Sequence, residues 1–520
     1  MVRLSALTVC LVVLLVARAA PAAEPVVFDI DGGRTFAISP YVYGTNPADW
    51  KTWSRHLTLG RWGGNRITAY NWETNASNAG SDWNHQNDAL LSNTDKPGEA
   101  VRTNLAAAFD AGAAYVVTVP LAGYVAADKK GDGDVKQTPD YLAKRFCVSL
   151  PAKQAPLSMT PDPADGKVYQ DEFVNWLEKT FPESARRPGQ TIFYALDNEP
   201  DLWAGTHARI HPQKATYEEV ARLNAEYAAA IKAVAPKALV FGFVSYGWHG
   251  FRTLQDAPDG KGRDFLDFYL DAMAAAEKKA GRRLVDVLDL HWYPEARGGN
   301  VRITEDQTSA PVAAARIQAP RSLWDPTFKE ESWITGNLRE PIRLLPRVRE
   351  QIEKHYPGTR LAMTEYTYGA GDHISGGLAQ ADALGIFGRE GLFAAAWWKT
   401  SKGDDRFGHG GFALYRDYDG KGGAFGDTGL AATCSDAAKA SVYASRDAQG
   451  RLVLVAINKT TEPLPVRLNR ANCPAAKSVT TYRMDDQHPQ PQAAGETPVG
   501  PGPVELTLPA LSASTLVFTP

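Results

Sequence analysis

The sequence lacks three features that would narrow its class at once: many cysteines, an excess of charge of one sign, and a second long hydrophobic run. Only 4 cysteines occur in 520 residues, and none has the CxxC spacing of a zinc site. The 56 lysines and arginines nearly balance 59 aspartates and glutamates. That balance gives no electrostatic reason to expect nucleic acid or an anionic membrane as a partner.

The first 23 residues hold the longest apolar run, and they have the pattern of an export signal. Arg3 supplies the positive start, and the apolar stretch from Leu7 to Val16 is too short to span a bilayer. Small residues at 20–23 form a cleavage region. We therefore expect a secreted protein, in the periplasm or the medium, rather than one anchored in a membrane.

Removal of this signal takes Cys10 with it and leaves three cysteines. Cys434 and Cys473 flank strand-like segments of the same terminal region, whereas Cys147 lies far from both. An odd number of cysteines in an exported protein permits one bridge and one free thiol. We expect the bridge, if one forms, to join Cys434 and Cys473.

Between residues 41 and 431, strand-like runs alternate with helix-like patterns. Apolar residues at helical spacing cover Tyr217–Val234, which Pro236 ends, and similar patterns cover 263–280, 340–355 and the shorter Gln380–Gly391. The strand candidates are 41–46, 57–62, 114–119, 191–196, 239–245, 285–290, 360–365 and 393–398. This alternation predicts an α/β fold, a parallel (β/α)8 TIM-like barrel with large loop insertions. The alternative is a doubly wound open sheet, which no GxGxxG after the first strand supports.

After residue 431 the helical patterns end. Residues 432–520 contain short strand-like segments separated by Gly, Pro and Asn turns, which predicts an additional antiparallel β-sandwich. Residues 24–40 resemble a strand, a Gly-Gly turn and a second strand, and we expect this N-terminal hairpin to pair into the sandwich. The proline-rich segment 488–503 is interpreted as a surface loop.

Two predicted barrel strands end in a glutamate. Residues 190–200, QTIFYALDNEP, end with Asn198 and Glu199, and residues 360–369, RLAMTEYTYG, contain Glu365. Catalytic groups of (β/α)8 barrels lie at the carboxyl ends of the strands, so the two carboxylates should meet at one mouth. Hydrolysis of a glycosidic bond needs two such groups. Asn198 is placed to hold a substrate hydroxyl.

Other strand ends supply candidates for substrate binding. Tyr293 is expected to donate to the nucleophilic carboxylate, Arg61 to favour its ionised form, and His291 to contact substrate hydroxyls. One of Trp397 and Trp398 should stack on a sugar while the other packs. The full set of substrate-binding candidates is Arg61, Asn65, Trp72, Asn198, His291, Tyr293, Trp397 and Trp398.

Four motifs together resemble glycoside hydrolase family 44: RWGGNRITAYNWETNASNAGSDW, YALDNEPDLW, LDLHWYP and MTEYTYG. The resemblance extends from about residue 25 to the C-terminus. It implies endo-acting β-1,4-glucanase or xyloglucanase activity, with a barrel and a β-sandwich. Glu199 then matches the general acid/base, and Glu365 matches the nucleophile. The resemblance implies no cofactor for catalysis and leaves room for a structural calcium ion, whose ligands the sequence does not identify.

From these observations we expect a secreted retaining endo-glycosidase that acts on a β-glucan polysaccharide as a monomer. Glu365 attacks the anomeric carbon, and Glu199, its pKa raised by the neighbouring carboxylate, protonates the leaving oxygen. Two alternatives stay open. The same carboxylates serve an endo-xylanase or a mannanase equally well, and a non-catalytic polysaccharide-binding protein is disfavoured by the presence of both glutamates with Asn198 and Tyr293.

Overall fold

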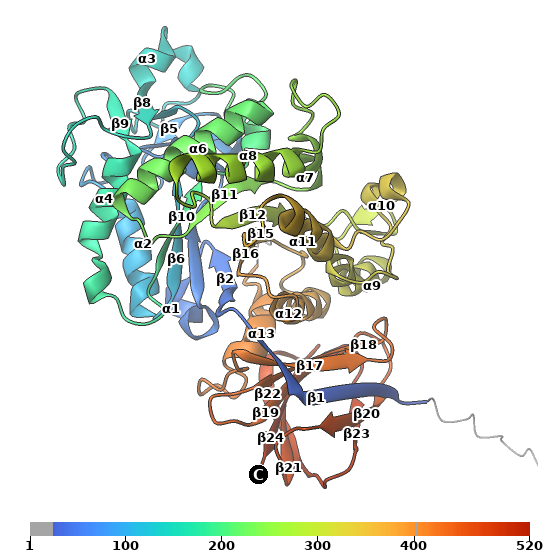
Figure 1. Cartoon of the computed structure of the whole chain (residues 1–520). Helices are drawn as coiled ribbons and strands as arrows, with labels where there is room; N and C mark the ends of the chain where they lie inside the picture. Colours follow the sequence, from blue (N-terminus) through green and yellow to red (C-terminus); the bar gives the residue numbers. More distant parts are fainter. Residues whose placement is uncertain (1–23, 401–402) are drawn as a thin grey trace, which may run out of the picture.

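The computed structural model describes residues 24–400 and 403–520, so the predicted export signal lies outside the described residues. Figure 1 shows a barrel surrounded by helices and, below it, a sheet built from the C-terminal part of the chain and the N-terminal strand β1. None of the described helices has the length and apolar character needed to cross a membrane.

Eight parallel strands form a closed barrel, in the spatial order β10-β11-β12-β15-β16-β2-β3-β6. Each predicted strand has a counterpart, and the predicted (β/α)8 fold is confirmed. Their bounds are β2 (Tyr41–Asn46), β3 (Leu59–Trp62), β6 (Ala114–Val119), β10 (Ile192–Leu196), β11 (Val240–Ser245), β12 (Val287–Trp292), β15 (Arg360–Tyr366) and β16 (Ala394–Trp398).

A helix follows each barrel strand. These are α1 (Trp50–Trp53), α2 (Glu99–Asp110), α4 (Gln170–Thr180), α6 (Tyr217–Val234), α8 (Phe265–Ala280), α11 (Leu344–His355), α12 (Ile374–Arg389) and α13 (Arg406–Arg416). Helix α6 has the predicted bounds because Thr216 and Glu219 form a capping box at its start. Helix α12 is longer than predicted, and its residues 374–388 are all buried, so it shows no polar face to mark its first turns.

The loops between these elements contain short strands and helices, most of them at the carboxyl end of the barrel. They are β4 (Ser77–Asn78), β5 (Asn87–Asp88), β7 (Tyr124–Ala126), α3 (Tyr141–Arg145), β8 (Phe146–Leu150), β9 (Lys167–Tyr169), α5 (Trp203–Thr206), α7 (Trp248–Thr253), β13 (Arg297–Gly298), β14 (Val301–Arg302), α9 (Ala310–Gln318) and α10 (Trp333–Leu338).

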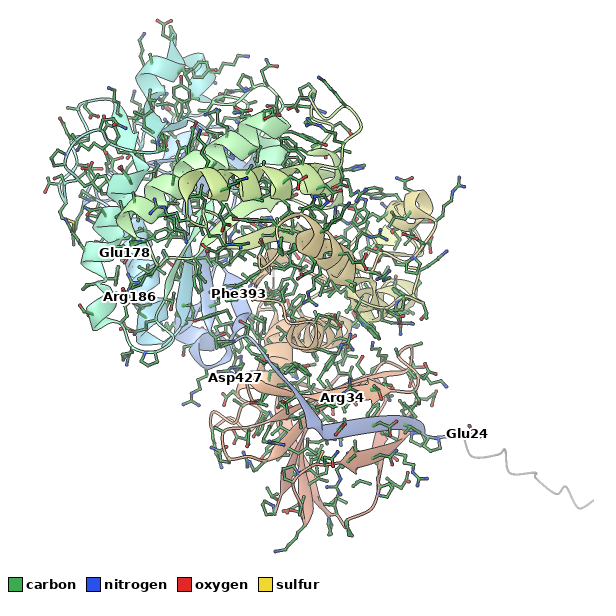
Figure 2. All side chains as sticks on the ribbon, in the orientation of Figure 1. Glu24, Arg34, Glu178, Arg186, Phe393 and Asp427 are labelled. Carbon is green, nitrogen blue, oxygen red and sulfur yellow. The ribbon has the colours of Figure 1, made fainter. Side chains whose placement is uncertain are left out.

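Aromatic rings close the end of the barrel opposite the carboxyl ends of its strands. Phe193 packs edge-on against Tyr41 and Phe393, with ring centroids 5.1 and 5.8 Å apart, and Phe241 packs beside it. Figure 2 labels Phe393 at the start of β16. The barrel interior is therefore a packed core at this end, and the catalytic groups of such barrels lie at the other end.

The second domain is a nine-stranded sheet with the order β22-β21-β24-β19-β18-β17-β1-β20-β23. Its residues enclose a core of their own that includes Phe28, Leu454, Val466 and Phe518, and the predicted additional β-sandwich is confirmed. The strands are β1 (Val26–Ala37), β17 (Thr428–Cys434), β18 (Ala440–Arg446), β19 (Leu452–Asn458), β20 (Leu464–Ala471), β21 (Ser478–Asp485), β22 (His488–Pro498), β23 (Val504–Leu508) and β24 (Ser512–Thr519). Strand β17 begins at Thr428, inside the range that the sequence assigned to the barrel.

The predicted N-terminal hairpin is wrong, because residues Val26–Ala37 form one strand. This strand pairs antiparallel with β17 and parallel with β20, so both of its edges are occupied. The Gly-Gly pair forms an irregularity between Asp31 and Thr35 instead of a turn. A Cβ at Gly32 would lie 2.3 Å from the carbonyl oxygen of Asn472, so glycine is needed for close approach rather than for chain reversal.

Two other expectations for this domain are wrong. Much of the proline-rich loop is strand β22, which holds its prolines because it lies at the sheet edge and needs only one set of backbone bonds. Cys434 and Cys473 are free thiols. Cys434 pairs with Phe28 across one edge of β1, and Cys473 lies beside Gly32 across the other, so a strand separates them. Next-but-one strands are about 10 Å apart, beyond the reach of a disulfide.

The sheet packs against helices α12 and α13 of the barrel. Strand β19 is buried along its whole length, because alternate side chains face the core of the sheet domain and the barrel helices. Lys459 and Asp382 form an ion pair of 2.8 Å with both side chains 1% exposed, and Tyr443 donates to Asp382 at 2.6 Å. The backbone N–H of Ile38 donates to the carbonyl of Asp427 where the chain leaves the sheet for the barrel (Figure 2).

Candidate active site

The chain turns sharply at the end of β10, and this turn aims Glu199 into the mouth of the barrel. Asp197 and Glu199 have φ values of 63° and 46°, a conformation that is unfavourable for residues other than glycine. It persists because the Glu199 N–H donates to the carbonyl of Val244 at 2.8 Å. The buried Asp197 carboxylate accepts from the Thr68 hydroxyl at 2.6 Å and from the N–H of Ala122.

Glu365 lies at the end of β15 between two donors. Arg61 Nη1 donates to Oε1 at 2.6 Å, and the Tyr293 hydroxyl donates to Oε2 at 2.6 Å. Arg61 Nη2 also donates to Oδ1 of Asn198 at 2.8 Å, so one guanidinium holds both the carboxylate and the neighbour of Glu199. Both donors stabilise a negative charge on Glu365 and fix its orientation.

The two glutamates are close to each other. A carboxylate oxygen of Glu199, one of Glu365 and a ring nitrogen of His291 all lie within 4.8 Å of one another. An inverting pair needs about 6.5–9.5 Å to admit a water, whereas a pair that includes a nucleophile is about 5–5.5 Å apart. This geometry suits proton donation and nucleophilic attack at one anomeric centre.

The electrostatic surroundings of Glu199 favour its protonated form. Burial raises its pKa to about 7, Arg61 opposes the shift, and Asp82 adds to it. The expectation that a neighbouring carboxylate is the main cause is therefore wrong, because burial has the largest effect. A carboxyl with this pKa holds a proton near neutral pH and can donate it.

A cleft of about 450 Å³ opens above the two carboxylates. Asn65, Asn198, Tyr293 and Trp398 line it, so the structure places these four candidates where a substrate would lie. Gly64 has φ +97°, and a Cβ there would lie 2.8 Å from the Trp398 ring. The glycine therefore lets this tryptophan reach the wall of the cleft.

The structure places the other four substrate-binding candidates outside the lining of the cleft. Trp72 is 1% exposed and stacks on Phe173 at 5.7 Å, so it belongs to the core. Trp397 packs edge-on against His409, which leaves Trp398 as the exposed member of the pair.

Arg61 and His291 are fully buried beneath the carboxylates. Arg61 contacts Glu365, and His291 contacts both glutamates. Both lie outside the lining of the cleft and contact the carboxylates, so their contact with substrate stays a prediction.

Sequence reasoning missed several residues of the cleft. Tyr246 and Trp248 follow β11, and Trp333 begins helix α10 in a distant loop. Tyr246 and Trp248 could have been predicted, because they directly follow the carboxyl end of β11, where barrel sites form. Nothing local marks Trp333, since loop folding alone brings it to the cleft. Asp82, Glu295 and Arg302 complete the polar lining.

The structure does not identify ligands for the calcium ion that the resemblance leaves open. Within 24–400 and 403–520, the one group of three acidic or histidine side chains close enough to hold a metal ion is Glu199, His291 and Glu365. These residues are the carboxylate pair and the histidine beneath it rather than a separate structural site.

A closed parallel barrel whose strand ends bring two carboxylates this close defines a class, the barrel glycosidases. Residues 76–296 match the model of glycoside hydrolase family 44. A Paenibacillus polymyxa xyloglucanase of that family has a similar structure, with a TM-score of 0.91 and 39% identity over 96% of this chain and 100% of that one. It has also been solved with xyloglucan, at 38% identity and a TM-score of 0.91. The chain therefore belongs to glycoside hydrolase family 44.

Two curated relatives agree with this assignment. The chain is 42% identical to Endoglucanase A of Paenibacillus lautus over 84% of its own length, and 41% identical to Beta-mannanase/endoglucanase A of Caldicellulosiruptor saccharolyticus over 90%. It spans 64% of the first relative and 37% of the second.

Proposed function

We propose that this protein is a secreted endo-acting glycosidase that cleaves β-1,4-glucan backbones, xyloglucan among them, with retention of anomeric configuration. The observation that supports the mechanism is the closeness of Glu199 and Glu365, since one carboxylate oxygen of each lies within 4.8 Å of the other. A pair this close favours direct attack by the second carboxylate over attack by a water held between it and the sugar. Export is supported by the pattern of residues 1–23.

In the first step Glu365 attacks the anomeric carbon, and the bond to the leaving oxygen breaks as that oxygen takes the proton of Glu199. Arg61 and Tyr293 hold the Glu365 carboxylate in place until the new carbon–oxygen bond forms. The product is a glycosyl ester on Glu365 and a shortened chain with a free hydroxyl.

In the second step Glu199 acts as a base. It removes a proton from a water that attacks the same carbon, and the ester bond to Glu365 breaks. Two inversions at one carbon give net retention. The proton taken from water restores Glu199 for the next cycle.

The aromatic lining of the cleft supports a polysaccharide substrate. Tyr246, Trp248, Trp333 and Trp398 offer flat faces on which pyranose rings can stack. The glucan preference rests on the activities of the relatives, which are endoglucanases and xyloglucanases, and one of them is also a beta-mannanase.

The test is release of reducing ends from xyloglucan, carboxymethyl cellulose, xylan and mannan, with Glu365→Ala as the control. Activity on the two glucans that is absent from the variant supports the proposal. Activity on xylan or mannan alone keeps the chemistry and overturns the substrate. Proton NMR of the first product tests retention, because an inverting enzyme gives the opposite anomer at early times.

A further inference from the structure

We propose that Asp289 and Thr364 are positioning residues that fix the proton of His291 on Nε2 and thereby hold a proton on Glu199. The inference rests on the proposed function, since it explains how Glu199 is kept ready as an acid. It assigns a role to three buried side chains that do not line the cleft.

The four side chains form a continuous row from the back of the barrel strands to the cleft. Asp289 accepts two bonds from Thr364, one from its N–H at 3.1 Å and one from its hydroxyl at 2.7 Å. The hydroxyl oxygen of Thr364 lies 3.4 Å from Nε2 of His291. Nδ1 of the same ring lies 2.8 Å from Oε1 of Glu199 and 3.5 Å from Oε2 of Glu365, the oxygen that accepts from Tyr293.

The positions of the protons follow from counting donors. Thr364 has one hydroxyl proton, and the short contact to Asp289 uses it. Toward His291 this oxygen can then only accept, so the proton of the neutral ring belongs on Nε2. Nδ1 therefore presents a lone pair, and a 2.8 Å contact with a carboxyl oxygen is a hydrogen bond only if Glu199 is the donor.

The electrostatics of these groups agree with this proton arrangement. Burial lowers the pKa of His291 to about 3, so the ring is neutral. Burial raises the pKa of Glu199 to about 7, which favours its protonated form, and raises that of Asp289 to about 6. The other charged or titratable groups that act on Glu199 or His291 are Arg61, Asp82, Asp201, Tyr246, Tyr293 and Glu365.

The same arrangement assists the second step of the reaction. After Glu199 has given its proton to the leaving oxygen, its carboxylate faces the lone pair of Nδ1. This contact is repulsive, so it favours recovery of a proton from the attacking water. A ring with its proton on Nδ1 would instead stabilise the carboxylate and weaken both roles.

Asp289→Asn tests the proposal because it reverses the direction of the hydrogen bonds along the row. An asparagine that accepts from the Thr364 N–H turns its amide toward the hydroxyl, which must then donate to Nε2 and move the ring proton to Nδ1. We expect the apparent pKa of the basic limb in the pH profile of kcat/KM on a glucan to be lower by about one unit or more. Thr364→Val should shift it in the same direction by less, and Thr364→Ser should keep the original profile.

The tautomer is read independently of activity by long-range nitrogen–proton NMR on histidine-labelled protein at pH 6.5. His291→Asn identifies the signal by its loss among the 10 histidines. We expect the proton on Nε2 in the original protein and on Nδ1 in Asp289→Asn. A proton on Nδ1 in the original protein, or an unchanged basic limb in a folded Asp289→Asn, overturns the inference. Inactivity on every glycan with the expected tautomer overturns the proposed function alone.

Discussion

The hydroxyl of Tyr293 donates a 2.6 Å hydrogen bond to Oε2 of Glu365, so the end of strand β12 holds the carboxylate that ends strand β15. A bond to a charged group contributes about 1.5–3 kcal/mol. We expect Tyr293→Phe to lower kcat on a glucan by about 10- to 100-fold.

The matched control for this variant is Tyr246→Phe. Tyr246 also lines the cleft, but its hydroxyl donates to the side-chain amide oxygen of Gln255 instead of to a catalytic carboxylate. We expect this change to alter KM more than kcat. Equal losses of kcat in both variants would contradict the role of Tyr293.

Removal of the nucleophile should abolish turnover. We expect Glu365→Ala to lower kcat by more than about a thousandfold, because the change removes the carboxylate that forms the glycosyl ester. Thermal unfolding shows whether the fold is kept, and added azide should restore cleavage of an activated aryl glycoside. Full activity in the variant would refute the assignment.

The loss of activity on removal of the general acid should depend on the leaving group of the substrate. We expect Glu199→Ala to lose about 100- to 10,000-fold on polysaccharide and far less on an aryl glycoside whose phenolate leaves without a proton. The comparison of kcat/KM on the two substrates is the measurement. A uniform loss would argue against a role in protonation.

The pH dependence of activity follows from the raised pKa of Glu199. Only the protonated form can donate, and this pKa is raised to about 7, so kcat/KM should fall as the pH rises through about 7. The fall should disappear with an activated aryl glycoside, for which the donated proton is not needed. A profile flat to pH 9 on polysaccharide would contradict the acid role.

The ion pair between Asp382 and Lys459 should matter for stability. Breaking a buried pair leaves one charge without a partner, so we expect Lys459→Met to lower the free energy of unfolding by about 3–5 kcal/mol. The control is Lys237→Met, whose pair with Glu183 is 81% and 68% exposed and should contribute less than about 1 kcal/mol. Urea unfolding of both variants makes the comparison, and equal effects would contradict it.

Local pattern was enough to predict the barrel and the pair of glutamates. The strands that lead to Glu199 and Glu365 are short and, apart from the exposed Arg360, buried, and they come in the sequence order that a parallel barrel requires. Once the strands are placed, the carboxyl ends must meet, so residues 166 positions apart in the numbering become neighbours.

Predictions from local sequence were wrong where one residue type has two structural uses. The sequence around Trp72 predicts a residue that lines the cleft, but its ring packs in the core against Phe173. The sequence predicts a turn at Gly32, but this glycine lies within strand β1 and lets the backbone of Asn472 come close. Burial decides between such uses, and burial depends on residues far away in the chain.

Hydrophobic periodicity and helix caps are local, so the order of strands and helices and the two carboxylates at barrel strand ends could be predicted from the sequence. The places of Tyr293 and Arg61 at strand ends also predict their contact with a carboxylate. The distances of these contacts and the position of His291 beneath both glutamates depend on the tertiary structure, because the three residues come from other strands. The protonation state of Glu199 depends on those contacts and on burial, so it is set by the whole fold and not by any one segment.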